Sequence, residues 1–252
     1  MKSEKIFNIV MENRTIEKLN INVAKKAVEQ FYLESVKDQH SRYKSWEHCY
    51  KVFKDNRKCR DNEETIDYLA LHLGFYLASW GMMRGSSFLL NKDYKVHTKV
   101  VEEILKTKYD DLQGRTAEDM LANNNDIINR IIELAKTVKT IYSNNGEETN
   151  NATDTLVTKI LLGTLGCTPA YDRYFKESLK EYGYCQTFNE KSLTGVANFY
   201  IRNQKIFDDL LKELNAKDKG IEYTEMKLMD MCMWQMAMDK SKEGKNNDET
   251  RR

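Results

Sequence analysis

The sequence predicts an all-α protein, either a single multi-helix globular bundle or two helical lobes with a cleft between them. Its 252 residues include one proline and 11 glycines, which is too few for the many turns that a β-rich fold needs. Apolar residues recur at intervals of three and four, whereas alternating strand patterns are hard to find. A chain of this length can bury a sizeable core.

The charge of the chain is balanced, with 40 Lys and Arg residues against 39 Asp and Glu residues. Because no global basic field exists, a nucleic-acid partner would have to contact a local basic patch. The five cysteines form no CxxC pair, which is typical of reduced cytosolic thiols. No His or Cys pair has the spacing of a metal site, so we expect neither a metal nor another cofactor.

The sequence also indicates a cytoplasmic protein without a membrane partner. The N-terminus lacks the apolar segment and cleavage site of a secretory signal. The most apolar run, residues 68–90, is too often interrupted by glycine and polar residues to span a membrane. The oligomeric state remains open.

Residues 1–142 are expected to form an N-terminal helical lobe. Its helices are predicted by apolar positions at three- and four-residue spacing and by capping residues at their starts. We expect them at residues 3–20, 22–36 (with Asn22 as cap), within 41–53, from 68 to about 80, at 96–106, in a short segment after Thr116, and at 125–142.

The polar segment 143–153 has the composition of a linker and is the best candidate for a boundary. A C-terminal helical lobe is then expected over residues 154–239, followed by a polar, disordered tail at 240–252. Within the lobe we expect an apolar helix ending near Gly163, a second helix at 173–180, a long helix from about 193 to 214 capped by Ser192, and a Met-rich closing helix starting at Thr224.

The stretch Asp154–Phe175 combines an apolar helix, a small-residue turn and an acidic residue. Lys159 lies on the helix, and Asp172 follows the turn that contains the only proline. Hydrolysis of an N-glycosidic bond needs an ionised carboxylate near the sugar, and a nearby lysine permits a Schiff base. These two residues are therefore the candidate catalytic groups.

The run VTKILLGTLGCTPAYDRYF resembles the core of the helix-hairpin-helix (HhH-GPD) DNA glycosylases. Leu162–Ala170 is similar to the hairpin that grips a backbone phosphate in that family, and Ala170–Arg173 is similar to the segment that carries the catalytic aspartate. Gly166 and Asp172 are only six positions apart, a shorter interval than the family uses. Either the hairpin is truncated or Asp172 is not the catalytic acid.

The resemblance implies a DNA glycosylase or glycosylase/lyase acting on modified or damaged bases, in DNA repair or phage defence. Asp172 would be the catalytic carboxylate and Lys159 a nucleophile. The expected contacts to DNA come from the hairpin, from the turn around Arg84, whose small residues suit an anion, and from aromatic side chains that stack on a base. They are Gly166, Thr168, Arg173 and Arg84 for phosphates, and Tyr171 and Trp80 for the base.

Two other functions remain open. The first alternative is a helical module that binds nucleic acid or protein without catalysis, in which case Asp172 is only a helix cap and Lys159 a snorkelling side chain. Arg42 and His48 also fit the loose Arg–His signature of HEPN-type ribonucleases, although their spacing leaves them about 120° apart on a straight helix. The sequence does not indicate which base is recognised, or whether the nucleic acid is DNA or RNA.

Overall fold

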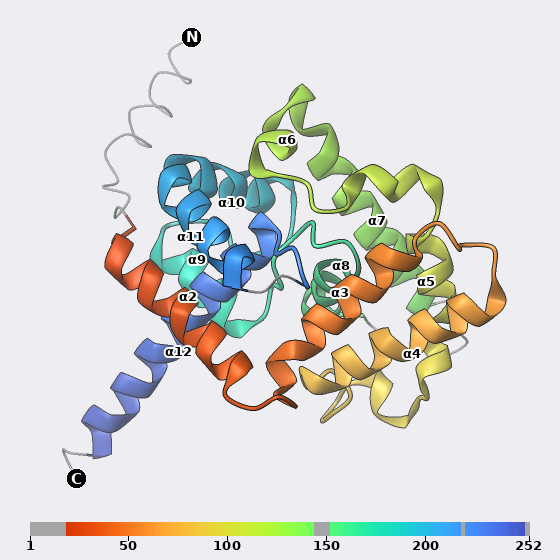
Figure 1. The fold of residues 1–252 in the computed structure, drawn as a ribbon, viewed down its shortest axis with the longest axis horizontal. Coiled ribbons are helices and arrows are strands. Elements are labelled where there is room, and N and C mark those ends of the chain that lie inside the picture. The colour runs from red at the N-terminus through yellow and green to blue at the C-terminus, as the bar shows by residue number, and fades with distance from the viewer. Residues whose placement is uncertain (1–18, 144–151, 218–219, 250–252) are drawn as a thin grey trace.

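The computed structural model describes residues 19–143, 152–217 and 220–249, and it confirms the all-α prediction. Every regular element in this part of the chain is a helix (Figure 1). The α-helices are α2 (Ile21–Val36), α3 (Ser45–Asn56), α4 (Glu63–Ser79), α5 (Thr98–Ile104), α6 (Ala117–Leu121), α7 (Asp126–Ser143), α8 (Asp154–Thr164), α9 (Arg173–Glu181), α10 (Glu190–Arg202), α11 (Gln204–Lys217) and α12 (Glu225–Glu249). The helix predicted at 3–20 falls almost wholly outside the described residues.

Short 3-10 helices connect several of these elements. They are η1 (Arg42–Lys44), η2 (Phe88–Asn91), η3 (Tyr94–His97), η4 (Thr107–Leu112) and η5 (Asn123–Asn125). None of the helices within the described residues has the length and apolar character that crossing a lipid bilayer requires.

Side-chain caps determine where many helices begin. Asn62 accepts the Thr65 N–H at the start of α4, and Thr153 accepts the Leu156 N–H at the start of α8. Thr116 caps α6, as the sequence predicts, within a complete capping box. Each such cap satisfies a backbone N–H that the helix leaves unpaired and contributes about 1 kcal/mol.

Several helix ends differ from the prediction. Helix α4 begins at Glu63 rather than at residue 68. The cap of α2 is Asn20 rather than Asn22, and the cap of α10 is Asn189 rather than Ser192, because each of these asparagine side chains accepts the N–H of the residue predicted as cap. The long helix predicted at 193–214 is broken in two at Asn203, whose φ of −116° and ψ of 21° end α10.

The C-terminal helix α12 is longer than the sequence predicts. It continues to Glu249, through most of the segment 240–252 for which the composition favours disorder. Lys240 forms an ion pair with Glu181 of α9, and the Lys and Glu residues of the segment have high helix propensity. The last three residues lie outside the described part of the chain.

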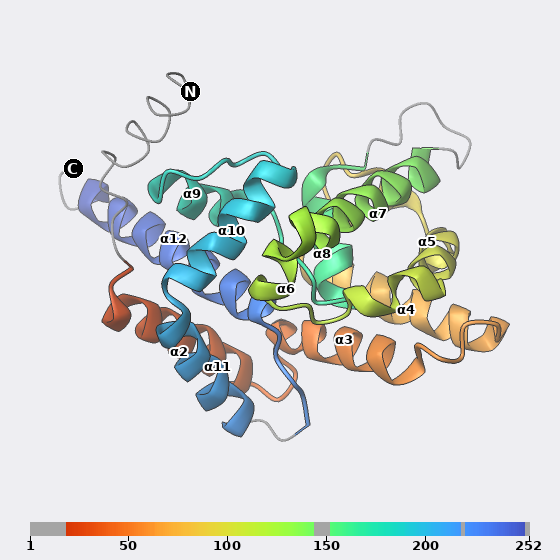
Figure 2. The ribbon, with the colours of Figure 1, turned by 90° about the horizontal axis from the view of Figure 1, so that it is seen from above.

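The helices gather in two groups, each with segments from before and after residues 143–153 (Figure 2). Figure 2 shows α2, α9, α10, α11 and α12 on one side, with α3, α4, α5, α7 and α8 on the other. Helix α2 packs on α12, and α3 and α4 pack on α8, so segments from before and after residues 143–153 share one hydrophobic core. Residues 144–151, most of the predicted linker, lie outside the described residues.

Candidate functional site

A small enclosed cavity lies where the two groups of helices meet. Its volume is about 10 Å³, which is roughly the room that one water molecule needs. Two lysines, two carboxylates and four aromatic rings surround it, and we call this set the lysine–aspartate box. The lining residues are Phe31 of α2, Tyr76 and Trp80 at α4, Lys159 and Leu162 of α8, Asp172 before α9, and Lys227, Asp230 and Trp234 of α12.

The first ion pair joins Lys159 and Asp172, the two residues that the sequence analysis singles out. Nζ of Lys159 lies 3.2 Å from Oδ2 of Asp172. The other carboxylate oxygen, Oδ1, accepts the N–H of Phe175 at 3.2 Å, so Asp172 is also the N-cap of α9. The carboxylate is therefore held at both oxygens, one by a cation and one by the start of a helix.

The loop before α9 is fixed against α8 by two threonines. Thr155 donates its hydroxyl to the carbonyl oxygen of Tyr171, and the hydroxyl of Thr158 accepts the N–H of the same residue, both at 2.8 Å. These bonds place Asp172, the next residue, over Lys159, which lies four positions after Thr155 on the same face of α8. The local sequence thus determines the first ion pair.

A second ion pair, Lys227 with Asp230, lies in the same box. Nζ of Lys227 is 3.1 Å from Oδ2 of Asp230 within α12. Oδ1 of Asp230 accepts the N–H of Ala170 at 3.0 Å, so this carboxylate also holds the loop that carries Asp172. Burial lowers the pKa of Lys227; the charge of Asp230 opposes that effect, and the positive charge of Lys159 adds to it.

Aromatic rings form the walls of the box and face the two ammonium groups. Nζ of Lys159 lies 5.0 Å from the ring centroid of Trp80, and Nζ of Lys227 lies 4.8 Å from that of Phe31. Arg42 lies over the Trp80 ring at 5.4 Å. Such cation–π contacts stabilise a positive charge away from water. The Nε1 atom of Trp80 is buried without a hydrogen-bond partner among the described residues.

Three of the residues predicted to contact DNA are buried. Gly166 and Thr168 lie inside the core, and neither offers a surface to a phosphate in this structure. The Tyr171 ring is fully buried against Phe175, and its hydroxyl lies 2.9 Å from that of Ser192. These positions hold the loop in place rather than lining the box.

The two glycines of the stretch have packing roles. At Gly163 a side chain would collide with the ring of Tyr76, so the absence of Cβ lets α4 approach α8. Gly166 has a φ of +62° and packs against Tyr50 and Thr224. A positive φ after the last helical turn is a common way to end a helix, and glycine adopts it without strain.

The two predicted arginine contacts lie at the surface. Arg173 is exposed, lies 4.5 Å from the centroid of Tyr174 and pairs with Glu177. Arg84 lines an open groove of about 550 Å³ between the C-terminal end of α4 and the N-terminal end of α8. The groove is lined by Gly81, Met82, Arg84, Gly85, Ser86, Ser87, Phe88, Thr153, Thr155 and Leu156.

The open groove adjoins the box at two places in the chain. Trp80 lines the box, and the next residue, Gly81, lines the groove. Thr155 lines the groove, and Lys159, one turn further along α8, lines the box. The two cavities are thus lined by residues that are neighbours along α8 and at the end of α4.

The Arg42–His48 pair does not converge on one site. Arg42 lies over the Trp80 ring at the end of α4. His48 is exposed on α3 and close enough to His72 to contribute to the lowered pKa of that residue, which burial mainly causes. His72 and Trp80 are about two turns apart along α4, and no contact joins Arg42 and His48 within the described residues.

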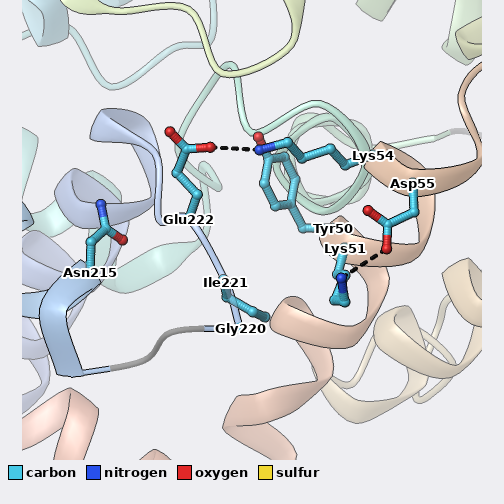
Figure 3. A pocket seen from close by; sticks show the side chains of 8 residues that line it. All are labelled: Tyr50, Lys51, Lys54, Asp55, Asn215, Gly220, Ile221 and Glu222. Carbon is cyan, nitrogen blue, oxygen red and sulfur yellow. Dashed lines mark hydrogen bonds and ion pairs between the residues drawn. The ribbon is translucent and has the colours of Figure 1, made fainter.

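A second open cavity, of about 410 Å³, lies between α3 and the segment before α12 (Figure 3). Its charged side chains neutralise one another, since Lys51 pairs with Asp55 at 2.9 Å and Lys54 with Glu222 at 2.6 Å. Burial raises the pKa of Tyr50 to about 12, so its hydroxyl stays protonated at neutral pH. This cavity offers exposed, paired charges and is the weaker candidate.

Comparisons with protein-family models, with curated protein sequences and with solved structures found no match to this chain. Among the described residues, no group of three or more His, Cys, Asp and Glu side chains is placed to hold a metal ion. The box and the groove are therefore the features of the molecule that bear on its function.

Proposed function

We propose that this chain is a DNA glycosylase or glycosylase/lyase that acts on modified or damaged bases, with Asp172 as its catalytic carboxylate. The observation that carries the proposal is the ion pair between Lys159 and Asp172, at 3.2 Å, inside a nearly closed aromatic box. The family resemblance of residues 156–175 gives these same two residues catalytic roles.

The environment of Asp172 suits stabilisation of a positive sugar. As the bond from C1′ to the base breaks, C1′ acquires the positive charge of an oxocarbenium-like centre, and a fixed carboxylate lowers its energy. Lys159, 3.2 Å from Oδ2, holds the carboxylate in place until substrate binds. The Phe175 N–H holds the other oxygen, so the group does not have to be reoriented during the reaction.

Access to the box requires a movement of its walls. A cavity of about 10 Å³ holds no sugar or base, and a flipped nucleotide needs a pocket of its own size. Trp80 is the half-buried wall next to the groove. We infer that this ring moves aside and then stacks on the extruded nucleotide, since base–aromatic stacking is tolerant of sequence.

The groove and the exposed arginines suit the DNA backbone. Arg84 stands beside the hydroxyls of Ser86, Ser87 and Thr155, and such groups contact phosphate oxygens without reading sequence. Arg173 adds a charge at the start of α9. With a net charge of +1, the chain can neutralise only a few phosphates, so binding should depend less steeply on salt than in strongly basic proteins.

The test is base release from a panel of duplexes that each carry one modified or damaged base. The parent protein should release at least one of these bases, and Asp172→Asn should reduce the rate by about 100-fold or more, as expected for losing one fixed electrostatic group. Asp209→Asn, which changes an exposed carboxylate on α11, is the matched control and should act like the parent. Equal rates for parent and Asp172→Asn would remove the assignment.

One observation favours a second candidate, a helical module that binds nucleic acid without catalysis. Asp172 caps α9 through the Phe175 N–H, which by itself explains an acidic residue at this place. This alternative predicts salt-sensitive DNA binding with no product from any duplex in the panel, and unchanged affinity in Asp172→Asn.

A further inference from the structure

The box contains a second amine that the proposed function does not use. Lys227 lies on α12, and its side chain is 3% exposed, against 6% for Lys159. Its Nζ atom lies over the rings of Phe31 and Trp46, at 4.8 and 5.3 Å from their centroids. A lysine placed this deep, beside a second lysine, needs an explanation beyond packing.

We propose that Lys227 is the amine that captures the sugar aldehyde of an abasic site as an imine, with Asp230 as the acceptor of its proton. Lys159 remains the cation that pairs with Asp172. This inference rests on the proposed function, because base release is what produces an abasic site in the same box.

The surroundings of Lys227 make it easier for its ammonium group to lose a proton, which such a reaction requires. An ammonium group is not a nucleophile, and lysines become nucleophilic when they are desolvated or placed near another cation. Lys227 has both conditions, and its pKa is lowered by burial and by the charge of Lys159, although Asp230 opposes this. Oδ2 of Asp230, 3.1 Å from Nζ, is in position to take the proton.

The two carboxylates connect the two amines to one loop. Asp230 accepts the N–H of Ala170, and Asp172 follows two residues later in the same loop. A sugar held by Asp172 thus lies within the reach of both lysines. If Lys159 were consumed in the imine, Asp172 would lose the cation that it pairs with. Separate roles for the two lysines preserve both the ion pair and the nucleophile.

The step balances without an oxidant or a reductant. The ring-opened deoxyribose presents an aldehyde at C1′, and Nζ of Lys227 adds to this carbon after giving a proton to Asp230. The C1′–O double bond is replaced by a C1′–N double bond. The oxygen leaves as water with two protons that the ammonium group carried. Sodium borohydride then adds hydride to the imine and fixes the link as a secondary amine.

The full chain is mixed with a duplex that contains one preformed abasic site, in the presence of sodium borohydride. The borohydride reduces the imine between protein and DNA to a stable adduct. The adduct is digested, and the modified lysine is identified by mass spectrometry of the peptides. We expect the sugar on Lys227 of the parent protein. An adduct on Lys159, on a surface lysine alone, or no adduct at all would overturn the inference. Because the modified lysine is located in the parent protein, this result does not depend on whether a variant folds.

Variants provide a second readout. Lys227→Met should reduce adduct formation at least tenfold, whereas Lys191→Met, on the exposed face of α10, should not change it. Lys159→Met should lose base release from modified duplexes while the adduct with preformed abasic DNA persists. A loss of adduct in Lys159→Met with retention in a folded Lys227→Met would assign the nucleophile to Lys159 instead.

The two proposals fail separately. Base release that depends on Asp172, without any adduct on Lys227, would leave the glycosylase proposal standing and overturn this one. An adduct on Lys227 with preformed abasic DNA, without release of any base in the panel, would support the role of Lys227 and overturn the glycosylase proposal.

Discussion

The two ion pairs of the lysine–aspartate box have the same internal arrangement but join different parts of the molecule. In each, Oδ2 of the aspartate meets a lysine and Oδ1 accepts a backbone N–H. Lys159 and Asp172 come from two helices and meet across a turn, whereas Lys227 and Asp230 lie three residues apart on α12.

Their exposure differs as well. The Asp172 side chain is 17% exposed and that of Asp230 is 10% exposed. A partly exposed carboxylate can exchange its lysine for a substrate cation or for water, and a deeply buried one cannot do so without a large cost. We therefore propose that the outer pair, Lys159 and Asp172, meets the sugar first. The inner pair, Lys227 and Asp230, would serve the step that needs an amine away from water.

The largest effect on stability is expected from breaking the inner pair. Lys227→Met leaves the Asp230 carboxylate buried without its cation, which costs about 3–5 kcal/mol. Chemical denaturation gives the free energy of unfolding. The double variant Lys227→Met/Asp230→Leu should recover part of the loss, because it removes both charges. A loss below about 1 kcal/mol in the single variant would show that the pair is hydrated.

Breaking the outer pair should cost less. In Lys159→Met the carboxylate of Asp172 keeps the Phe175 N–H and gains water at its exposed edge, so we expect a loss of about 1–2 kcal/mol. The same denaturation measurement applies. A loss as large as that of Lys227→Met would contradict the difference in burial between the two pairs.

The aromatic wall shared by both pairs gives a smaller effect. Trp80→Phe keeps a ring but weakens its contact with the charges of Lys159 and Arg42, at a cost of about 1 kcal/mol. Trp234→Phe is the matched control, since Trp234 lies in the box and packs edge-on against Trp80. If both variants lose the same stability in thermal unfolding, the wall acts by packing alone.

The pH dependence of stability separates the inner pair from the rest of the chain. Burial lowers the pKa of Lys227 in the folded state. Over a range of pH, the Lys227 side chain is therefore protonated in the unfolded chain but not in the folded one. The contribution of Lys227 to stability therefore rises with pH up to its ordinary value of about 10.4.

That contribution is the difference in unfolding free energy between the parent and Lys227→Met/Asp230→Leu, measured from roughly pH 8 to pH 10. As the pH rises, we expect the unfolding free energy of the parent to increase relative to that of the double variant. A difference that stays flat, or that moves in favour of the variant, would contradict a lowered pKa.

The sequence was sufficient to predict the all-α class, and it singles out Lys159 and Asp172, the two residues of the outer pair. Lys159 and Asp172 are close in the chain, and a helix, a turn and a helix start leave little freedom for how they meet. The inner pair was missed because a Met-rich helical stripe is typical of core. The signal that marks it is a Lys and an Asp, three residues apart, in an otherwise apolar helix.

Other features depend on contacts between segments that are distant in the chain. Phe31 and Trp80 reach the box from α2 and α4, and no local pattern indicates that α2 packs on α12. Gly166 and Thr168 have the residue types of a phosphate-binding turn, but tertiary packing buries them. Burial of a turn cannot be read from spacing alone, because it depends on which helices cover it.

The proposed function depends on the Asp172 carboxylate acting on the sugar in the box. Its most direct test is the single-turnover rate of base release for the parent and for Asp172→Asn, together with their thermal unfolding. Asparagine keeps the cap on α9, so the account predicts a small change in stability and a fall of about 100-fold or more in rate. A folded Asp172→Asn protein that releases the base as fast as the parent would contradict it.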